Sequence, residues 1–335
     1  MLEPPDIPHE HIRACLRDAY GVRAPEIAFL PLGADVNTAV YRTVADDGNP
    51  YFVKLRSGPF DELSVALPRW LSDQGIAHII PPVVTRDGRL WTCVGAFTVI
   101  LYPFVAGQDG FAVALSERQW HEFGTALRRI HTAAVPPALA GRLARETYTP
   151  HWREAVKLYL ARLEHDRFDD PIAAELAAFL QTQRTVILDL IGRAERLAGE
   201  LQAHPRPLVV CHSDIHAGNL LIDGGERLFI VDWDTPILAP KERDLMYIGG
   251  AQGFVGRTAD EEERLFYQGY GQVEIDPAAL AYYRYERIIQ DIAAYCEQLL
   301  LTTEGGADRE QSLRYVMSNF LPDSTIAMAY RTERC

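Results

Sequence analysis

The chain has 335 residues, of which 48% are hydrophobic and 24% are charged, a composition typical of a folded globular protein. The net charge of −13 argues against nucleic acid or an anionic membrane as the main partner, because both favour basic surfaces. A chain of this length is long enough to form two lobes, and its acidic surface favours a small cationic partner. No obligate protein partner is predicted.

The N-terminal stretch "MLEPPDIPHEHIRACL" places acids and prolines where a signal peptide has a basic segment and an apolar segment. The apolar stretch "CVGAFTVILYPFVAG" is too short to span a bilayer and is predicted to be a buried strand. Five scattered cysteines fit a reducing compartment better than a disulfide framework. We therefore expect a cytoplasmic protein with no membrane span.

The first part of the chain is predicted to be rich in strands. A short helix is expected over residues 8–20, and period-two alternation in "AVYRTVADDGNPYFVKLRSG" then predicts a hairpin that turns at "DDGN". The stretch "FDELSVALPRWLSDQG" predicts a helix with acids in its first turn, interrupted or ended near Pro68. Further strands are predicted in "PPVVTRDGRLWTCVGAFTVILYPF".

From Ser116 onward the hydrophobic period becomes helical, and Ser116 with Gln119 fits a capping box. One hairpin interrupts the helices: its strands are "LLID" and "RLFIVD", and "GGE" turns the chain. Arg243 and Asp244 are expected to form a structural pair, with Asp244 capping the following helix. The pattern therefore predicts an α+β fold with a strand-rich lobe over residues 1–105 and a larger, mainly helical lobe over residues 106–335.

The inserted hairpin carries the residues that indicate chemistry. Antiparallel pairing brings Asn219, before the first strand, beside Asp232, at the end of the second, and such oxygen ligands suit Mg²⁺. Asp214 precedes Asn219 by the spacing of a phosphoryl-transfer loop, in which an Asp accepts the proton of the attacking hydroxyl and an Asn binds metal. Lys54, near the end of a strand, is placed to pair with nucleotide phosphates, and Glu62 in the next helix is placed to hold that lysine by an ion pair.

Each of these residues also has a purely structural interpretation. A lysine on a strand edge is commonly a solvated charge, and Glu62 is equally suited to a helix dipole. His212 and His216 fit core histidines or, with Asp214, a metal pair, but zinc needs three or four ligands and no further His or Cys stands at suitable spacing nearby. The occurrence of lysine, glutamate, aspartate, asparagine and aspartate in that order across two lobes favours the kinase interpretation.

The segment "LPLGADVNTAVYRT" contains one glycine, Gly33, where protein kinases have a glycine-rich loop. Backbone N–H groups from Gly33 to Asn37 are placed to contact phosphate, although Asp35 adds a like charge. The chain has no Walker-type "GxxxxGK", so a P-loop fold is not supported.

The motif "HSDIHAGN", followed by "IVDWD", resembles the aminoglycoside phosphotransferase family, whose members are small-molecule kinases with a protein-kinase-like fold. The segments "GADVNTAVY", "LAPKERDLM" and "YYRYERI" resemble the branch of that family that phosphorylates spectinomycin. The resemblance runs over most of the chain. It implies a two-lobed protein-kinase-like fold, the use of ATP and Mg²⁺, and O-phosphorylation of an aminocyclitol or aminoglycoside antibiotic, most simply spectinomycin, with antibiotic resistance as the result.

Carried over to this chain, the resemblance implies that Asp214 is the catalytic base, that Asn219 and Asp232 hold Mg²⁺, and that Lys54 contacts the nucleotide phosphates. It also implies that adenine lies against the connector from Tyr102 to Val105. Pro103 has no N–H group, so Phe104 or Val105 is expected to donate the hydrogen bond to the base.

Three acidic or aromatic residues are candidates for substrate or metal binding. Asp234 is expected to project to the same side as Asp232 if the strand continues, where it would complete the metal shell or meet a substrate ammonium group; a solvated loop acid is the alternative. Arg287, Asp291 and Tyr295 share one face of a predicted helix, and we expect Asp291 and Tyr295 to contact the substrate. The alternative is an ion pair with aromatic packing.

Other functions compete with this one. A kinase of another small alcohol, such as choline, homoserine or a sugar-like metabolite, would share the same catalytic residues. A nucleotide-binding pseudoenzyme predicts the loss of a catalytic group, and all of these groups are present. A protein kinase is disfavoured because the helical part has no "DFG" and no activation segment ending in "APE".

Overall fold

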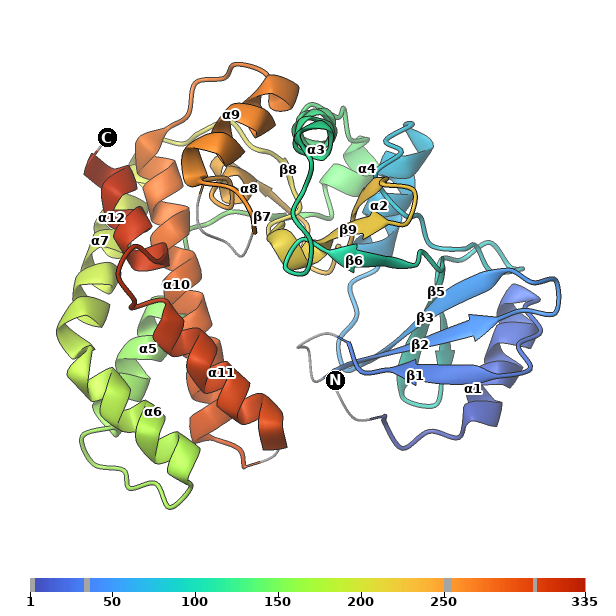
Figure 1. The fold of residues 1–335 in the computed structure, drawn as a ribbon, viewed down its shortest axis with the longest axis horizontal. Helices are drawn as coiled ribbons and strands as arrows, with labels where there is room; N and C mark the ends of the chain where they lie inside the picture. Colours follow the sequence, from blue (N-terminus) through green and yellow to red (C-terminus); the bar gives the residue numbers. More distant parts are fainter. Residues whose placement is uncertain (1–3, 33–36, 250–254, 304–305, 335) are drawn as a thin grey trace.

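The computed structural model describes residues 4–32, 37–249, 255–303 and 306–334. These residues form an α+β fold with two lobes, and this confirms the predicted fold class (Figure 1). Gly33 and Asp35 lie outside the described residues.

The smaller lobe contains a five-stranded antiparallel sheet in the order β1-β2-β3-β5-β4. Its strands are β1 (Ile27–Leu30), β2 (Thr38–Val44), β3 (Pro50–Ser57), β4 (Thr92–Val94) and β5 (Phe97–Pro103). β2 and β3 form the predicted hairpin, with Val44 opposite Pro50. Alternation along β3 buries Val53 and Leu55 with Ile12 of α1 (His9–Cys15) and turns Lys54 to the other face. The sheet thereby aims the lysine away from the core of its own lobe.

Helix α2 (Leu63–Asp73) runs without a break through Pro68, so the predicted interruption is wrong. Pro68 removes only the hydrogen bond to the Ser64 carbonyl near the start of the helix, and burial of the proline offsets that loss. The Asp61 carboxylate accepts the Leu63 N–H at 2.9 Å, so the helix begins after Glu62 and its first turn contains no acid.

The larger lobe is mainly helical. Ser116 and Gln119 form the predicted capping box at the start of α3. The helices are α3 (Glu117–His131), α4 (Pro137–Ala140), α5 (His151–Arg162), α6 (Pro171–Thr182), α7 (Arg184–Ala203), α8 (Glu242–Leu245), α9 (Ala259–Tyr270), α10 (Pro277–Leu300), α11 (Gly306–Ser318) and α12 (Thr325–Arg334). Among the described helices, none combines the length and apolar content that crossing a membrane requires.

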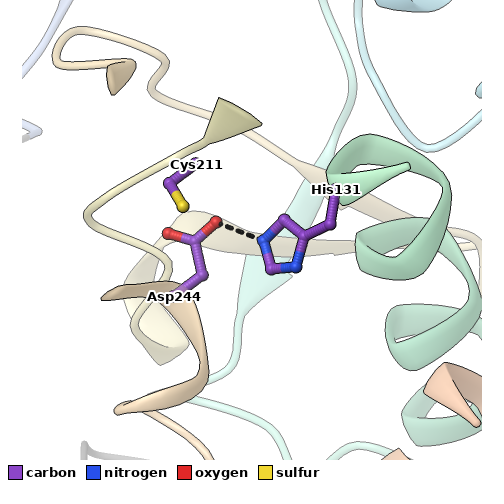
Figure 2. A group of neighbouring side chains, drawn as sticks. All are labelled: His131, Cys211 and Asp244. Atoms are coloured by element: carbon purple, nitrogen blue, oxygen red, sulfur yellow. Dashed lines mark hydrogen bonds and ion pairs between the residues drawn. The ribbon is translucent and has the colours of Figure 1, made fainter. Parts of the chain in front are cut away.

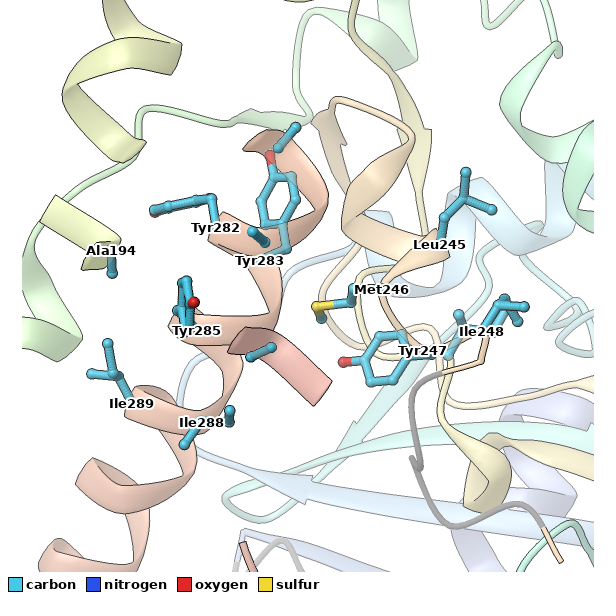
Figure 3. Close-up of a cluster of buried hydrophobic side chains, with 14 of the residues drawn as sticks. Ala194, Leu245, Met246, Tyr247, Ile248, Tyr282, Tyr283, Tyr285, Ile288 and Ile289 are labelled. Carbon is cyan, nitrogen blue, oxygen red and sulfur yellow. The ribbon is translucent and has the colours of Figure 1, made fainter. Parts of the chain in front are cut away.

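Helix α10 lies at the centre of this lobe and packs against α5, α7, α11 and α12. Figure 3 shows its Tyr283 and Tyr285 among buried side chains that include Ala194 of α7 and Met246, which follows α8. Aromatic residues of this size bury large apolar areas, so α10 is fixed on most of its faces. Residues on its remaining face are therefore held on a rigid support.

Two three-stranded sheets complete the larger lobe, in the orders β10-β9-β6 and β7-β11-β8. Their strands are β6 (Gly107–Asp109), β7 (Ala144–Arg145), β8 (Val209–Cys211), β9 (Leu220–Asp223), β10 (Leu228–Ile230) and β11 (Ile237–Ala239). β9 and β10 form the predicted second hairpin. We propose to divide the lobes after residue 105, because β5 belongs to the first sheet and β6 pairs with β9.

Candidate functional site

The loop that follows β8 is held by one buried carboxylate. Asp244 of α8 accepts the His212 N–H at 2.9 Å and the Ser213 N–H at 2.7 Å. His131 Nε2 of α3 lies 3.0 Å from the same carboxylate (Figure 2). Ser213 adopts a left-handed φ of 72°, a conformation that costs free energy and persists only where its surroundings impose it. Asp244 therefore shapes the loop that carries Asp214, a role different from the helix cap that the sequence predicts.

Cys211 lies next to Asp244 and His131, and one ligand atom from each of the three falls within 4.8 Å of the others (Figure 2). Both oxygens of Asp244 already accept N–H groups of the loop, and Cys211 Sγ lies 3.6 Å from the Pro240 carbonyl oxygen. A structural zinc site takes four ligands, which is more than this group offers. We assign the cluster to the scaffold of the loop.

Asp214 presents two oxygens with different surroundings. Its Oδ1 accepts a hydrogen bond from the Tyr247 hydroxyl at 3.2 Å and contacts the guanidinium of Arg287, whereas its Oδ2 lies 3.7 Å from His216 Nε2. Burial raises the pKa of Asp214, but the charge and hydrogen bond of Arg287, together with the two neighbouring histidines, lower it overall. Asp214 is therefore ionised at neutral pH, with Oδ1 engaged and Oδ2 facing the histidine.

Arg287 of α10 links Asp214 to a second acid. Its Nε lies 2.9 Å from Asp291 Oδ1, and its Nη1 lies 2.8 Å from the Tyr247 hydroxyl oxygen. Tyr295 is one helical turn beyond Asp291, and burial raises the pKa of its hydroxyl to about 12. Asp291 thus forms the ion pair at four-residue spacing that the alternative interpretation describes, and its contact with a substrate stays a prediction. Sequence reasoning placed Arg287 on this face but gave no signal of its contact with Asp214.

Lys54 meets two acids of the larger lobe. Its Nζ lies 2.9 Å from Asp232 Oδ1 and 2.8 Å from Asp234 Oδ1, and Arg56 reaches the other oxygen of Asp234 at 2.5 Å. Burial alone would lower the pKa of Lys54, but the two carboxylates raise it. These contacts bring the strand of the smaller lobe to the loop after β10, and Arg56 is a participant that sequence reasoning missed.

Asp232 and Asp234 reach the same lysine by a route different from the predicted one. β10 ends at Ile230, and Asp232 has a left-handed φ of 64°, so the strand does not continue to Asp234. The chain turns instead, and the turn directs both carboxylates to Lys54. The sequence predicted that Asp232 and Asp234 lie on the same side if the strand continues. They do lie on the same side, but a turn and not a strand places them there.

The predicted ion pair between Glu62 and Lys54 is not formed. The Glu62 carboxylate lies 3.0 Å from an Arg142 guanidinium nitrogen, and both side chains are about half exposed. Glu62 directly precedes α2, whereas Lys54 already has two carboxylate partners from the larger lobe. In this structure, therefore, Glu62 links the smaller lobe to residue 142 and does not support the lysine.

The two backbone donors predicted in the connector between the lobes differ in their hydrogen bonds. Phe104 donates its N–H to the Pro50 carbonyl at 3.0 Å, so this group is already used. Within the described part of the chain, nothing accepts the N–H of Val105. Tyr102 lies next to the last residue of β5, and burial raises the pKa of its hydroxyl. Of the two predicted donors, Val105 is the one whose N–H a ligand could use.

The oxygens of Asn219 and Asp232 fit a hard cation. The Val231 N–H donates to the Asn219 backbone carbonyl at 3.0 Å, which ties the two sides of the hairpin together. Asn219 Nδ2 donates to the Asp214 carbonyl at 2.7 Å, and across the described residues no donor reaches the amide oxygen Oδ1. Burial raises the pKa of Asp232, but Lys54 lowers it, so the carboxylate is ionised. One carboxylate and one amide oxygen are ligands that Mg²⁺ takes.

The chain is similar to known proteins over most of its length. The model of the phosphotransferase enzyme family matches residues 28–283. The crystal structure of spectinomycin phosphotransferase, APH(9)-Ia, in complex with ADP and spectinomycin is similar, with a TM-score of 0.91 and 37% identity over 99% of this chain and 100% of that one. Protein StrN of Streptomyces griseus is 26% identical over 253 residues, covering 72% of this chain and 75% of StrN. Homoserine kinase of Neisseria meningitidis serogroup B is 25% identical over 194 residues, covering 58% of this chain and 52% of that kinase.

Proposed function

The chain belongs to the phosphotransferase enzyme family and is a small-molecule kinase, and on that premise we propose that it transfers a phosphoryl group from ATP to a hydroxyl of spectinomycin or a related aminocyclitol or aminoglycoside. Antibiotic resistance is the proposed consequence. The observation that carries the proposal is the convergence of Lys54, Asp232 and Asp234 across the two lobes, beside the loop that holds Asp214. The 37% identity with a kinase bound to ADP and spectinomycin supports the substrate.

The proposed roles follow from the chemistry of each group. Asp214 is the base for the acceptor hydroxyl, and Lys54 neutralises nucleotide phosphates. Asn219 and Asp232 would hold Mg²⁺, which when bound supplies positive charge against the phosphates. The backbone of Val105, between Tyr102 and the larger lobe, would receive the adenine, with Phe104 and Gly33 as the remaining proposed nucleotide contacts.

The transfer step needs positioning and charge neutralisation more than covalent chemistry, because its transition state is loose. Arg287 and Tyr247 engage one oxygen of Asp214, which leaves Oδ2 to accept a hydrogen bond from the acceptor hydroxyl. The acceptor oxygen then bonds to the γ-phosphorus, the bond to the bridging oxygen of ADP breaks, and Asp214 receives the proton. An ionised Asp214, as its lowered pKa provides, is ready for this role at neutral pH.

The charges near Asp214 favour a cationic acceptor. Asp214 and Asp291 share the single charge of Arg287, so this group carries one net negative charge when both acids are ionised. Burial raises the pKa of Asp291, although Arg287 opposes that shift. We propose Asp291 and Tyr295 as substrate contacts that act beside Arg287, with Asp234 on the phosphate side of the site.

The test is an ADP-release assay of the purified protein with Mg²⁺-ATP against spectinomycin, other aminoglycosides, choline and homoserine. The Asp214→Asn variant, purified in parallel, controls for contaminating kinases. We expect saturable turnover with spectinomycin and no comparable turnover with choline. The similarity to a homoserine kinase makes homoserine the second candidate, and turnover with homoserine alone would keep the chemistry and reject the substrate.

A further inference from the structure

His216 lies close to both the proposed base, Asp214, and the proposed metal ligand, Asn219. Its Nε2 lies 3.7 Å from Asp214 Oδ2 and 3.5 Å from Asn219 Nδ2. The ring is neither in the core nor fully solvated, since 23% of its side chain is exposed. The sequence indicated either a core histidine or part of a metal pair for His216. The roles proposed for its neighbours in phosphoryl transfer do not include this residue.

The hydrogen bonds of the loop fix which nitrogen carries the proton. Nδ1 accepts the Gly218 N–H at 3.0 Å, which requires a lone pair on Nδ1. Among the residues that the structure describes, the other side-chain donor within hydrogen-bond distance of the ring is Asn219 Nδ2, which lies farther away and already donates to the Asp214 carbonyl at 2.7 Å. The neutral ring with its proton on Nε2 satisfies these contacts, so a donor points into the space beside Asp214 and Asn219.

The neighbours of the ring also fix its orientation. Phe111 stacks on His216 with centroids 5.4 Å apart and ring planes 23° from parallel. Tyr247 packs edge-on at 6.4 Å from another side. A Cβ atom at Gly218 would lie 2.4 Å from the Phe111 ring, so a larger residue there would push the ring from its place against His216. A donor held on three sides needs no reorganisation during the reaction, which is the property that makes fixed donors effective in catalysis.

We propose that His216 is a catalytic residue whose Nε2–H donates a hydrogen bond to a non-bridging oxygen of the phosphoryl group during transfer. This inference rests on the proposed function. The hydroxyl proton goes to Asp214, the electron pair of the broken bond leaves with ADP, and His216 keeps its own proton throughout. The histidine thus supplies a neutral donor on the acceptor side of the phosphoryl group, opposite the charge of Lys54.

The rival explanation is that His216 only caps the short turn at Ala217–Asn219 through Nδ1. Two substitutions separate the roles, because the side-chain amide of Asn reproduces Nδ1 and that of Gln reproduces Nε2. His216→Asn keeps an acceptor for Gly218 and removes the donor beside Asp214. His216→Gln keeps a donor near the Nε2 position and loses the cap.

We expect His216→Asn to lower kcat with spectinomycin about 100-fold, while its Mg²⁺-ATP affinity changes less than about twofold. His216→Gln should be at least about tenfold more active than His216→Asn, even if its melting temperature is lower. His165→Asn, which alters an exposed histidine, is the matched control and should be unchanged. Equal activities of the two His216 variants, or a more active His216→Asn, would overturn the proposal.

A second readout separates this inference from the proposed function. ADP release in the absence of an alcohol measures slow transfer to water, which needs the phosphoryl contact but not the acceptor. If the wild-type protein uses none of the alcohols, the proposed substrate fails, and the ratio of the two variants in this hydrolysis reaction still decides the role of His216. If the wild-type protein uses spectinomycin and His216→Asn does so equally well, only the inference about His216 fails.

Discussion

The two charge clusters of the site differ in where their members come from. Lys54 comes from the smaller lobe and binds Asp232 and Asp234 of the larger lobe, whereas Asp214 and Arg287 both belong to the larger lobe. The first cluster therefore depends on how the lobes meet, and the second is fixed by α10 and by the anchored loop. The proposed acceptor side is therefore held in place within one lobe. On the proposed nucleotide side, Mg²⁺ would have to replace Lys54 at the Asp232 carboxylate, and the phosphates would bind the lysine.

The largest effect is expected from removing the carboxylate of Asp214, the proposed base. Asp214→Asn should reduce turnover at least about 1,000-fold, because the acceptor proton then has no carboxylate to receive it. Its Mg²⁺-ATP affinity, measured by calorimetry, should stay close to that of the wild-type protein, since the proposed role of Asp214 is to bind the acceptor hydroxyl and not the nucleotide. Retained turnover with lost nucleotide affinity would mean that Asp214 binds the nucleotide and is not the base for the acceptor.

On the nucleotide side, Asp232→Ala should abolish the part of ATP affinity that depends on Mg²⁺, because it removes the carboxylate ligand of the proposed metal. Calorimetric titrations with Mg²⁺ and with EDTA should give the same affinity for this variant. Asp169→Ala, at an exposed acid for which the described structure gives no ion pair, is the control and should bind like the wild-type protein. An undiminished Mg²⁺ effect in Asp232→Ala would show that the ligand lies elsewhere.

Arg287→Gln tests whether the positive charge of Arg287 keeps Asp214 ionised and in place. Arg287 lowers the pKa of Asp214, so its removal raises that pKa and moves the acidic limb of the kcat/KM profile to higher pH. We expect a fall in kcat of about tenfold at neutral pH, because the Asp214 carboxylate also loses its orientation. Arg314→Gln changes an exposed arginine and should leave the profile in place. An acidic limb that stays where it is would mean that Arg287 does not act on Asp214.

The smallest effect is expected at Glu62, which the structure separates from Lys54. Glu62→Gln breaks an exposed ion pair with Arg142, and exposed pairs of this kind contribute at most about 1 kcal/mol to stability. The melting temperature should therefore fall by less than about 3 °C, and ATP affinity should change less than about twofold. A tenfold loss of ATP affinity would instead reveal that Glu62 moves to Lys54 when nucleotide binds.

The sequence predicted the parts of the molecule that depend on short-range pattern. The β2-β3 and β9-β10 hairpins follow from alternation and turn residues, and the capping box at Ser116 follows from one spacing. The break near Pro68 was mispredicted, because local propensity says nothing of the burial that offsets the lost hydrogen bond. The fold class followed from the change of hydrophobic period along the chain, and the family followed from the loop motif and the segments that accompany it.

The contacts that sequence reasoning missed join distant segments. Arg287 reaches Asp214, and Asp244 reaches His212, through the packing of helices whose angles no local pattern encodes. The preference of Lys54 for Asp234 over Glu62 also depends on how the lobes meet. In each case the residue types were visible, but the partner was decided by tertiary structure.

The buried carboxylate of Asp244 ties the loop to the folding of the whole larger lobe. Asp244 binds His131 of α3, and His131 in turn contacts the Tyr270 hydroxyl of α9 at 2.7 Å. We therefore expect the amide protons of His212 and Ser213 to exchange with solvent mainly when these helices separate. The loop should persist up to cooperative unfolding of the lobe, so that heat inactivation and the loss of tertiary structure follow one curve.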